Sequence, residues 1–244
     1  MCKKRMVVST VMVVLLVVTA LFSGCTGRVV SGAGEMVSQV FQVENFSAVN
    51  LNVPFVVVWQ SGPQTVATIE MQENLFAHLQ VSVENAVLVI ESARSFDVAA
   101  PNTPRLYITS PRLIGLQSCT AVVAKGWDTV YAAEFTINLE GGGVLEIPLN
   151  VDLLAVDINE GGADLTLSGY ATQANITVVG GVTLEALDLQ TAETHIRLTG
   201  GGTVDIAVSD VLDVAITGAG FIRYRGSPVI TQSITGFGSV SSAD

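Results

Sequence analysis

The stretch Ile216–Phe221, ITGAGF, decides the fold that the sequence predicts, because variants of it recur along the second half of the chain. In each variant an apolar residue precedes a glycine group, and the steps between units are 18 to 20 residues. The six apolar residues are Leu139, Ile158, Val178, Leu198, Ile216 and Ile234. A period of about 20 residues is typical of repeat architectures, in which each unit stacks on its neighbours.

Each unit also alternates between apolar and polar residues, as in ADLTLSG (163–169) and THIRL (194–198). This alternation predicts short β-strands with one face buried and the other exposed. The leucine-rich repeat has a similar period, but its L-x-x-L-x-L pattern is absent. We therefore expect an all-β solenoid, a parallel β-helix whose coils contain about 18–21 residues each.

The glycine groups are expected to stack as one sharp corner of the coils, because glycine adopts positive φ without steric penalty. A phosphate-binding loop would instead need a following helix and a lysine, and neither accompanies these glycines. The predicted corner contains Gly141–Gly143, Gly161–Gly162, Gly180–Gly181, Gly200–Gly202, Gly218/Gly220 and Gly236/Gly238.

The first residues are typical of an export signal. Lys3, Lys4 and Arg5 precede the uncharged apolar stretch Met6–Phe22, and SGC ends at Cys25. This layout resembles a bacterial lipoprotein signal, cleaved before Cys25, with Phe22 where the family usually has leucine. An uncleaved anchor and an ordinary secretory signal are the alternatives. We predict a signal over residues 1–24, a lipid on Cys25, and an extracytoplasmic domain held at the membrane of the cell envelope.

Charge excludes one class of partner. The chain has 22 acidic and 11 basic residues, a net charge of −11. Loss of residues 1–24 would remove three basic residues and no acid, which shifts the net charge to −14. Such a surface repels nucleic acid, so no nucleic-acid partner is expected. Only Cys119 would remain besides Cys25, so no intrachain disulfide is predicted.

The domain boundaries follow from composition. Residues 25–39 are small and polar and predict a tether, and residues 40–244 predict one domain. Its first part, 40–110, contains short strands, a hairpin turning at Glu84-Asn85 and a helical turn near residues 73–79. Its second part, 111–244, contains the glycine-marked repeats.

Chemical motifs are sparse. The two histidines, His78 and His195, are far apart and have no Cys/His spacing, so neither a metal site nor a cofactor is predicted. Glu140, Glu160 and Asp164 lie near the predicted corner, where carboxylates of neighbouring coils could pair as a glycosidase requires. Chance pairing of acids on an acidic outer face is the simpler interpretation, and no catalytic residue is predicted.

Two aromatic residues suggest a binding patch. Trp127 and Tyr131 fall in KGWDTVYAAEF (125–135), where the step between coils is longer and a wider loop could carry a ligand. The interpretation that we prefer for Trp127 is that it seals the start of the repeats. The candidate ligand-binding residues are therefore Trp127, Tyr131, Glu140, Glu160 and Asp164.

Several stretches together resemble a known family, the "putative auto-transporter adhesin, head GIN domain". They include FQVENFSAVNLNVPFVVVWQSG (41–62), VATIEMQENLFAHLQVSVENAVLVI (66–90), PRLYITSPRLIGLQSCTAVV (104–123) and GFIRYRGSPVI (220–230). The resemblance covers about residues 28–240. It implies a right-handed parallel β-helix, often on a lipoprotein at the cell surface, and it carries no catalytic motif.

We therefore expect a cell-surface lipoprotein with a non-catalytic, adhesin-like domain that serves in ligand binding or in structural presentation. Its membrane contact would be the lipid on Cys25, and its ligand a polysaccharide or a surface protein. The alternative is a glycan-processing β-helix enzyme that uses the corner carboxylates. An accessory role in the envelope is a third class that the sequence does not address.

Overall fold

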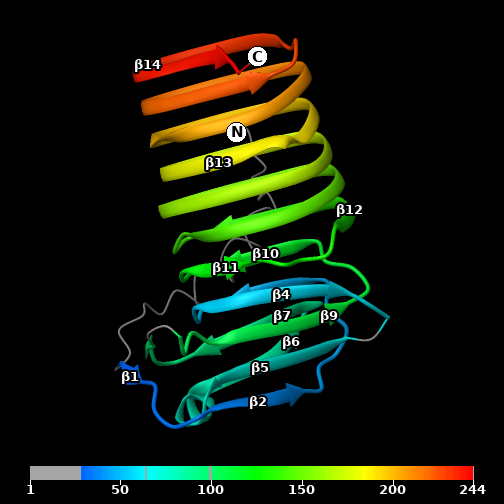
Figure 1. Ribbon diagram of the computed structural model, residues 1–244, viewed down its shortest axis with the longest axis vertical. Coiled ribbons are helices and arrows are strands. Elements are labelled where there is room, and N and C mark those ends of the chain that lie inside the picture. The colour runs from blue at the N-terminus through cyan, green and yellow to red at the C-terminus, as the bar shows by residue number, and fades with distance from the viewer. Residues whose placement is uncertain (1–28, 64, 99–100, 244) are drawn as a thin grey trace, which may run out of the picture.

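A computed structural model gives the structure of the chain (Figure 1) and describes residues 29–63, 65–98 and 101–243. The predicted signal over 1–24 and the predicted lipid site Cys25 lie outside the described residues. The strands are β1 Val30–Ser31, β2 Met36–Phe41, β3 Ala48–Leu51, β4 Phe55–Ser61, β5 Val66–Gln72, β6 Leu79–Glu84, β7 Val87–Ser92, β8 Phe96–Asp97, β9 Arg105–Ser110, β10 Gly115–Ser118, β11 Val122–Ala124, β12 Val130–Leu139, β13 Gly143–Arg225 and β14 Val229–Ser242; the 3-10 helix η3 is Glu73–His78.

One strand forms most of the second half of the structure. β13 contains 83 residues and winds around the core, so that its successive turns lie side by side (Figure 1). It pairs in parallel with β12, where Val130 lies opposite Leu149, and with β14, where Val211 lies opposite Val229. These offsets of 19 and 18 residues equal the repeat step of the sequence, because one repeat makes one turn.

Alternation of side chains along these turns builds a single core. Ile137 pairs with Val156 and Leu139 with Ile158, and all four side chains are buried. The residues between them in the chain face outward. Along the straight segments this period of two allows the strand to cover the core and to keep its polar residues in solvent, and it is interrupted at bends, as between the buried Val151 and Leu154.

The predicted glycine corner is confirmed. Gly161, Gly180, Gly200, Gly218 and Gly236 have φ between 119° and 129°. Each lies directly against the corner of the turn before it, and a Cβ on Gly200 would clash with the carbonyl oxygen of Gly180. Glycine is therefore required at this corner for two reasons, the backbone conformation and the close approach of neighbouring turns.

The first part of the domain follows a different topology. β2 pairs antiparallel with β5, β5 with β9, and β6 with β7. The β6–β7 hairpin turns at Asn85 and Ala86, whose φ values are 52° and 62°. A two-residue turn of this type can join only antiparallel strands. β2 begins at Met36, so the sheet starts within the segment 25–39 that was predicted as a tether.

The predicted fold class is therefore wrong in its architecture. The chain is all-β, but its main sheet is nearly closed and barrel-shaped, with the mixed order β2-β5-β9-β4-β11-β13-β12-β10-β3-β7-β6 and β14 paired to β13. It is not a right-handed parallel β-helical solenoid. The physical reason is that the hairpin and the reversals before Pro111 add antiparallel strands to the same sheet, and the glycine period carries no information about them.

Candidate binding surface

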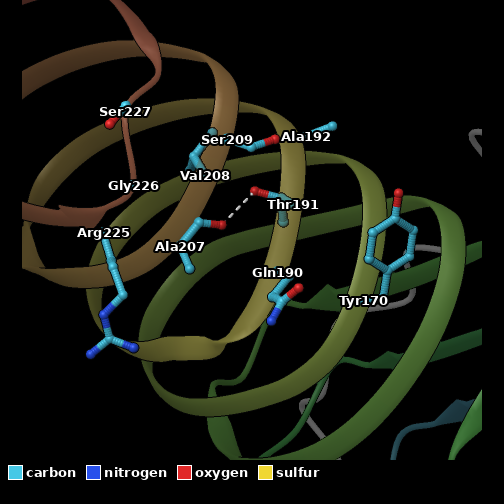
Figure 2. Close-up of a pocket in the computed structure, with 10 residues that line it drawn as sticks. All are labelled: Tyr170, Gln190, Thr191, Ala192, Ala207, Val208, Ser209, Arg225, Gly226 and Ser227. Carbon is cyan, nitrogen blue, oxygen red and sulfur yellow. Dashed lines mark hydrogen bonds between the residues drawn. The ribbon is translucent and has the colours of Figure 1, made fainter.

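A hollow of about 500 Å³ opens on the winding turns of β13 (Figure 2). Its walls come from consecutive turns and from the segment that leads to β14. The lining residues are Tyr170, Gln190, Thr191, Ala192, Ala207, Val208, Ser209, Arg225, Gly226 and Ser227. These residues span 58 positions of the chain, and the winding brings them to one place.

Glycines create the corner at which the hollow lies. Gly169 has φ 106° and directly precedes Tyr170, and Gly226 has φ 110° and directly follows Arg225. A Cβ on Gly226 would clash with the carbonyl oxygen of Val208 on the neighbouring turn. The chain can therefore bend sharply on both sides of the hollow, and Tyr170 and Arg225 are placed at its walls (Figure 2).

A buried pair of hydroxyl groups stabilises the wall of the hollow between Tyr170 and Arg225. The Thr191 Oγ1 atom lies 2.7 Å from Thr194 Oγ1, and it donates a hydrogen bond of 2.9 Å to the Ala207 carbonyl oxygen on the next turn. Both threonines are at most 3% exposed. Because a buried hydroxyl is costly to leave without a partner, these bonds fix the spacing of the two turns at the hollow.

The exposed groups of the hollow suit a hydroxyl-rich ligand, and the exposed Arg225 adds a positive charge at one wall. The Tyr170 side chain is 43% exposed and offers an aromatic face, and the Gln190 amide offers both a donor and an acceptor. Ser209 and Ser227 add hydroxyl groups. An apolar surface with a few placed polar groups is typical of small-molecule binding sites.

The structure separates the two aromatic residues predicted from sequence. Trp127 is 6% exposed, its Nε1–H donates a hydrogen bond of 2.9 Å to the Val57 carbonyl oxygen, and its ring packs edge-on against Trp59 at 6.1 Å. Its ring is therefore part of the core and is not available at the surface. Tyr131, on β12, is 67% exposed.

The structure brings two of the three candidate carboxylates together. Glu140 and Glu160 line one hollow of about 370 Å³ with Asn159 and Val179, at the glycine corner. Glu160 has φ 56°, a conformation that is rare for a residue with a side chain. Asp164 is exposed and does not line this hollow.

A second acidic hollow lies further along β13. Glu185, Asp188 and Asp205 line a space of about 240 Å³. Arg223 donates to Asp205 from the next turn, with Nε 2.8 Å from Oδ1, and this hydrogen bond and charge raise the pKa of Arg223 above its ordinary value. Within residues 29–63, 65–98 and 101–243, no group of three or more His, Cys, Asp or Glu residues could hold a metal ion.

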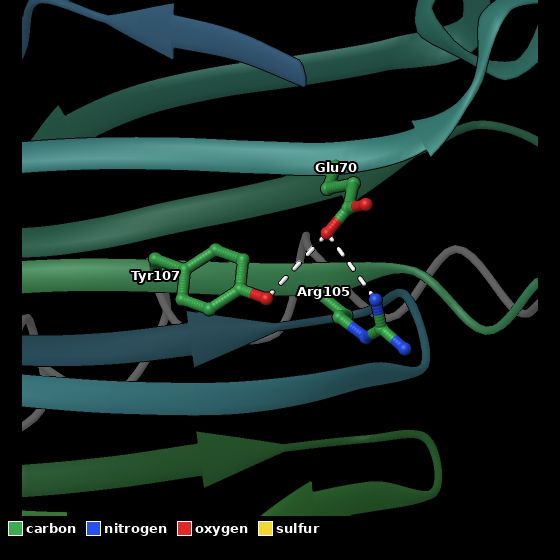
Figure 3. A network of polar contacts seen from close by, with 3 residues as sticks. All are labelled: Glu70, Arg105 and Tyr107. Atoms are coloured by element: carbon green, nitrogen blue, oxygen red, sulfur yellow. Dashed lines mark hydrogen bonds and ion pairs between the residues drawn. The ribbon is translucent and has the colours of Figure 1, made fainter. Parts of the chain in front are cut away.

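A polar network on the antiparallel part of the sheet has a structural role (Figure 3). Glu70 Oε2 lies 3.4 Å from Arg105 Nη1 and accepts a hydrogen bond of 3.5 Å from the Tyr107 hydroxyl. Glu70 and Arg105 are direct partners in the β5–β9 register. The network therefore favours this register of the two strands, which the sequence alone did not predict.

Sequence reasoning missed the principal residues of the hollow. Tyr170 and Gln190 were not singled out, and Arg225 was quoted only within GFIRYRGSPVI (220–230), one of the stretches that carry the family resemblance. One signal was present, because Gly169 lies outside the predicted glycine corner and so marks a second bend. The convergence of positions 170, 190 and 225 depends on the winding of β13.

Comparison with known proteins identifies the family. A family profile described as "Putative auto-transporter adhesin, head GIN domain" matches residues 45–228. The chain belongs to this family. No curated protein matches the chain. The described part of the chain also contains no helix that is long and apolar enough to cross a membrane.

Solved structures share the fold of this head GIN chain. A crystal structure described as a putative adhesin from Bacteroides fragilis NCTC 9343 is 22% identical, with a TM-score of 0.78, and covers 87% of this chain and 99% of its own. A second, described as a putative lipid binding protein from Parabacteroides distasonis ATCC 8503, is 20% identical, with a TM-score of 0.67, and covers 89% and 100%. At these identities the likeness establishes the fold alone.

Proposed function

We propose that this head GIN chain is a non-catalytic binding protein of the cell surface, which holds a polysaccharide in the hollow around Tyr170. The observation that carries the proposal is the combination of an exposed aromatic face with the Gln190 amide and serine hydroxyl groups in one hollow. Aromatic faces pack against the apolar face of a sugar ring, while amides and hydroxyls bond its hydroxyl groups.

Display at the surface would follow from the amino-terminal segment. Cleavage before Cys25 and attachment of lipid there would leave residues 26 onward outside the cytoplasm. The family supports this location, because its description is that of an adhesin. Mass spectrometry of the membrane fraction would test the anchor, since a lipid-modified peptide beginning at Cys25 is expected, and an intact Met1 peptide would contradict it.

A glycan array tests the binding function, scored for both retention and cleavage. We expect retention of a polysaccharide without products, and at least about tenfold weaker binding for Tyr170→Ala, which corresponds to about 1.4 kcal/mol. Tyr131→Ala is the matched control, because it removes an exposed tyrosine outside the hollow. Equal loss in both variants, or no retention, would contradict the proposal.

Cleavage in the same assay would favour the enzymatic alternative. The observation behind that alternative is the shared hollow of Glu140 and Glu160. A hydrolase that used this pair would lose its activity in Glu140→Gln and in Glu160→Gln. We expect both variants to keep full glycan retention, because the pair lies outside the hollow around Tyr170.

A further inference from the structure

We infer that β14 is a self-association surface, at which two copies of this chain pair edge to edge about a two-fold axis. β14 pairs with β13 along one side, and no strand in the described ranges pairs with its other side from residue 229 to 241. It has 14 residues, whereas the other edge strands, β2 and β6, have six each. A long unpaired edge is a template for another strand.

β14 lacks the features that usually protect an edge. Its sequence, VITQSITGFGSVSS, contains no charged residue and no proline, although the whole chain has a net charge of −11. Natural proteins place charges, prolines or bulges on exposed edges to prevent pairing. A second copy can therefore pair along this edge without electrostatic repulsion between side chains of the two β14 strands.

Apolar surface is concentrated at the same edge. Phe237 is 86% exposed and Val229 is 73% exposed. Ile234 and Val240 pack against the core but stay partly exposed, because no further turn among the described residues covers them. Pairing would cover Ile234 and Val240, the inward residues, as each turn of β13 does for the turn before it.

The glycine corner makes a second copy the best-fitting partner. Gly236 divides β14 into seven residues before the bend and six after it. A two-fold axis through the bend exchanges these two legs, so a copy of β14 laid antiparallel on itself bends at the same place. A straight strand from another protein would not follow the bend.

The register also matches at the level of side chains. Ile234 and Val240 face the core on the two legs, and a Cβ on Gly238 would approach the side chains of Ile216 and Ile234. Antiparallel pairing centred on Gly236 places Gln232 opposite Val240 of the second copy and Ile234 opposite its Gly238. Inward residues then face inward residues, and the two cores become continuous.

Head-to-head pairing has a consequence for the orientation of two chains. β14 lies at the opposite end of the molecule from β1 and β2 (Figure 1). Two paired copies therefore carry their β1 ends far apart. If each chain is tethered at its amino terminus, as proposed above, the pair would connect two surfaces. This connecting role depends on the proposed tether, but the self-pairing does not.

Gln232→Lys tests the pairing directly. Gln232 lies opposite the buried Val214 in the register but is itself exposed, so a lysine there is solvated in the monomer and desolvated in the pair. Sedimentation equilibrium of the full chain in excess detergent is expected to show a dimer, with at least about a hundredfold weaker association for Gln232→Lys. Thr203→Lys is the matched control, because it adds the same charge to an exposed site on a turn within β13.

Amide hydrogen exchange provides a second test that needs no variant. Exchange in residues 229–241 should slow as the protein concentration rises through the dissociation constant, while exchange within β13 stays constant. A monomer at all concentrations from micromolar to millimolar would overturn the inference. So would a dimer that Gln232→Lys does not weaken, or one that leaves exchange in β14 unchanged, since either outcome places the interface elsewhere. Open-ended polymers would overturn the two-fold arrangement.

Discussion

At the scale of single residues, the glycine corner makes the sharpest prediction. Gly200 has φ 127°, and a Cβ on it would clash with the carbonyl oxygen of Gly180. We expect Gly200→Val to lower the free energy of unfolding by at least about 2–4 kcal/mol, because a β-branched residue has no relaxed conformation there. Urea denaturation followed by circular dichroism measures the change.

Gly162 provides the matched control at the same corner. No heavy atom lies within 4 Å of a Cβ placed on it, and its φ is not in the left-handed region. Gly162→Ala should therefore change stability by less than about 0.5 kcal/mol or increase it slightly. Equal losses of stability in the Gly162 and Gly200 variants would show that the stacking of the corner does not require glycine.

At the scale of the strand, alternation separates essential from replaceable positions. Ile216 is 1% exposed and lies in the inward row, whereas Thr217, the next residue, is exposed. Ile216→Ala should cost about 2–5 kcal/mol, because it leaves a cavity that the neighbouring turns cannot fill. Thr217→Ala should cost less than about 0.5 kcal/mol. Thermal unfolding of the two variants measures the difference, and similar costs would contradict the inward assignment of Ile216.

At the scale of the whole molecule, stability should decrease toward β14. Each turn of β13 has neighbours on both sides, but β14 has a partner strand on one side among the described residues. We expect amides of residues 229–241 to exchange at least about tenfold faster than those of residues 174–178, because local opening costs less at an open end. Hydrogen-exchange mass spectrometry measures these rates. The Gln232→Lys variant is used because its weakened pairing leaves β14 without protection from a second copy. Uniform exchange would indicate that the sheet opens only as a unit.

The sequence by itself determined the local features of this protein. Alternation predicted the strands and the inward rows, such as Ile137 and Leu139, because each side chain reports its own solvent exposure. The glycine period predicted the corner at Gly180 and Gly200, because positive φ is a property of single residues. The hairpin near Asn85 was predicted for the same reason, as its turn depends on two adjacent residues.

Only the tertiary structure decided how these pieces are arranged. Pairing between segments that are distant in sequence decides whether β5 lies antiparallel beside β9 and whether the sheet closes into a barrel shape. Periodicity does not encode this pairing. The candidate site depends on the same winding, because Tyr170, Gln190 and Arg225 meet only after three further turns. For Trp127 the structure decides between two interpretations, because its hydrogen bond to the Val57 carbonyl oxygen places the ring in the core, as preferred from the sequence.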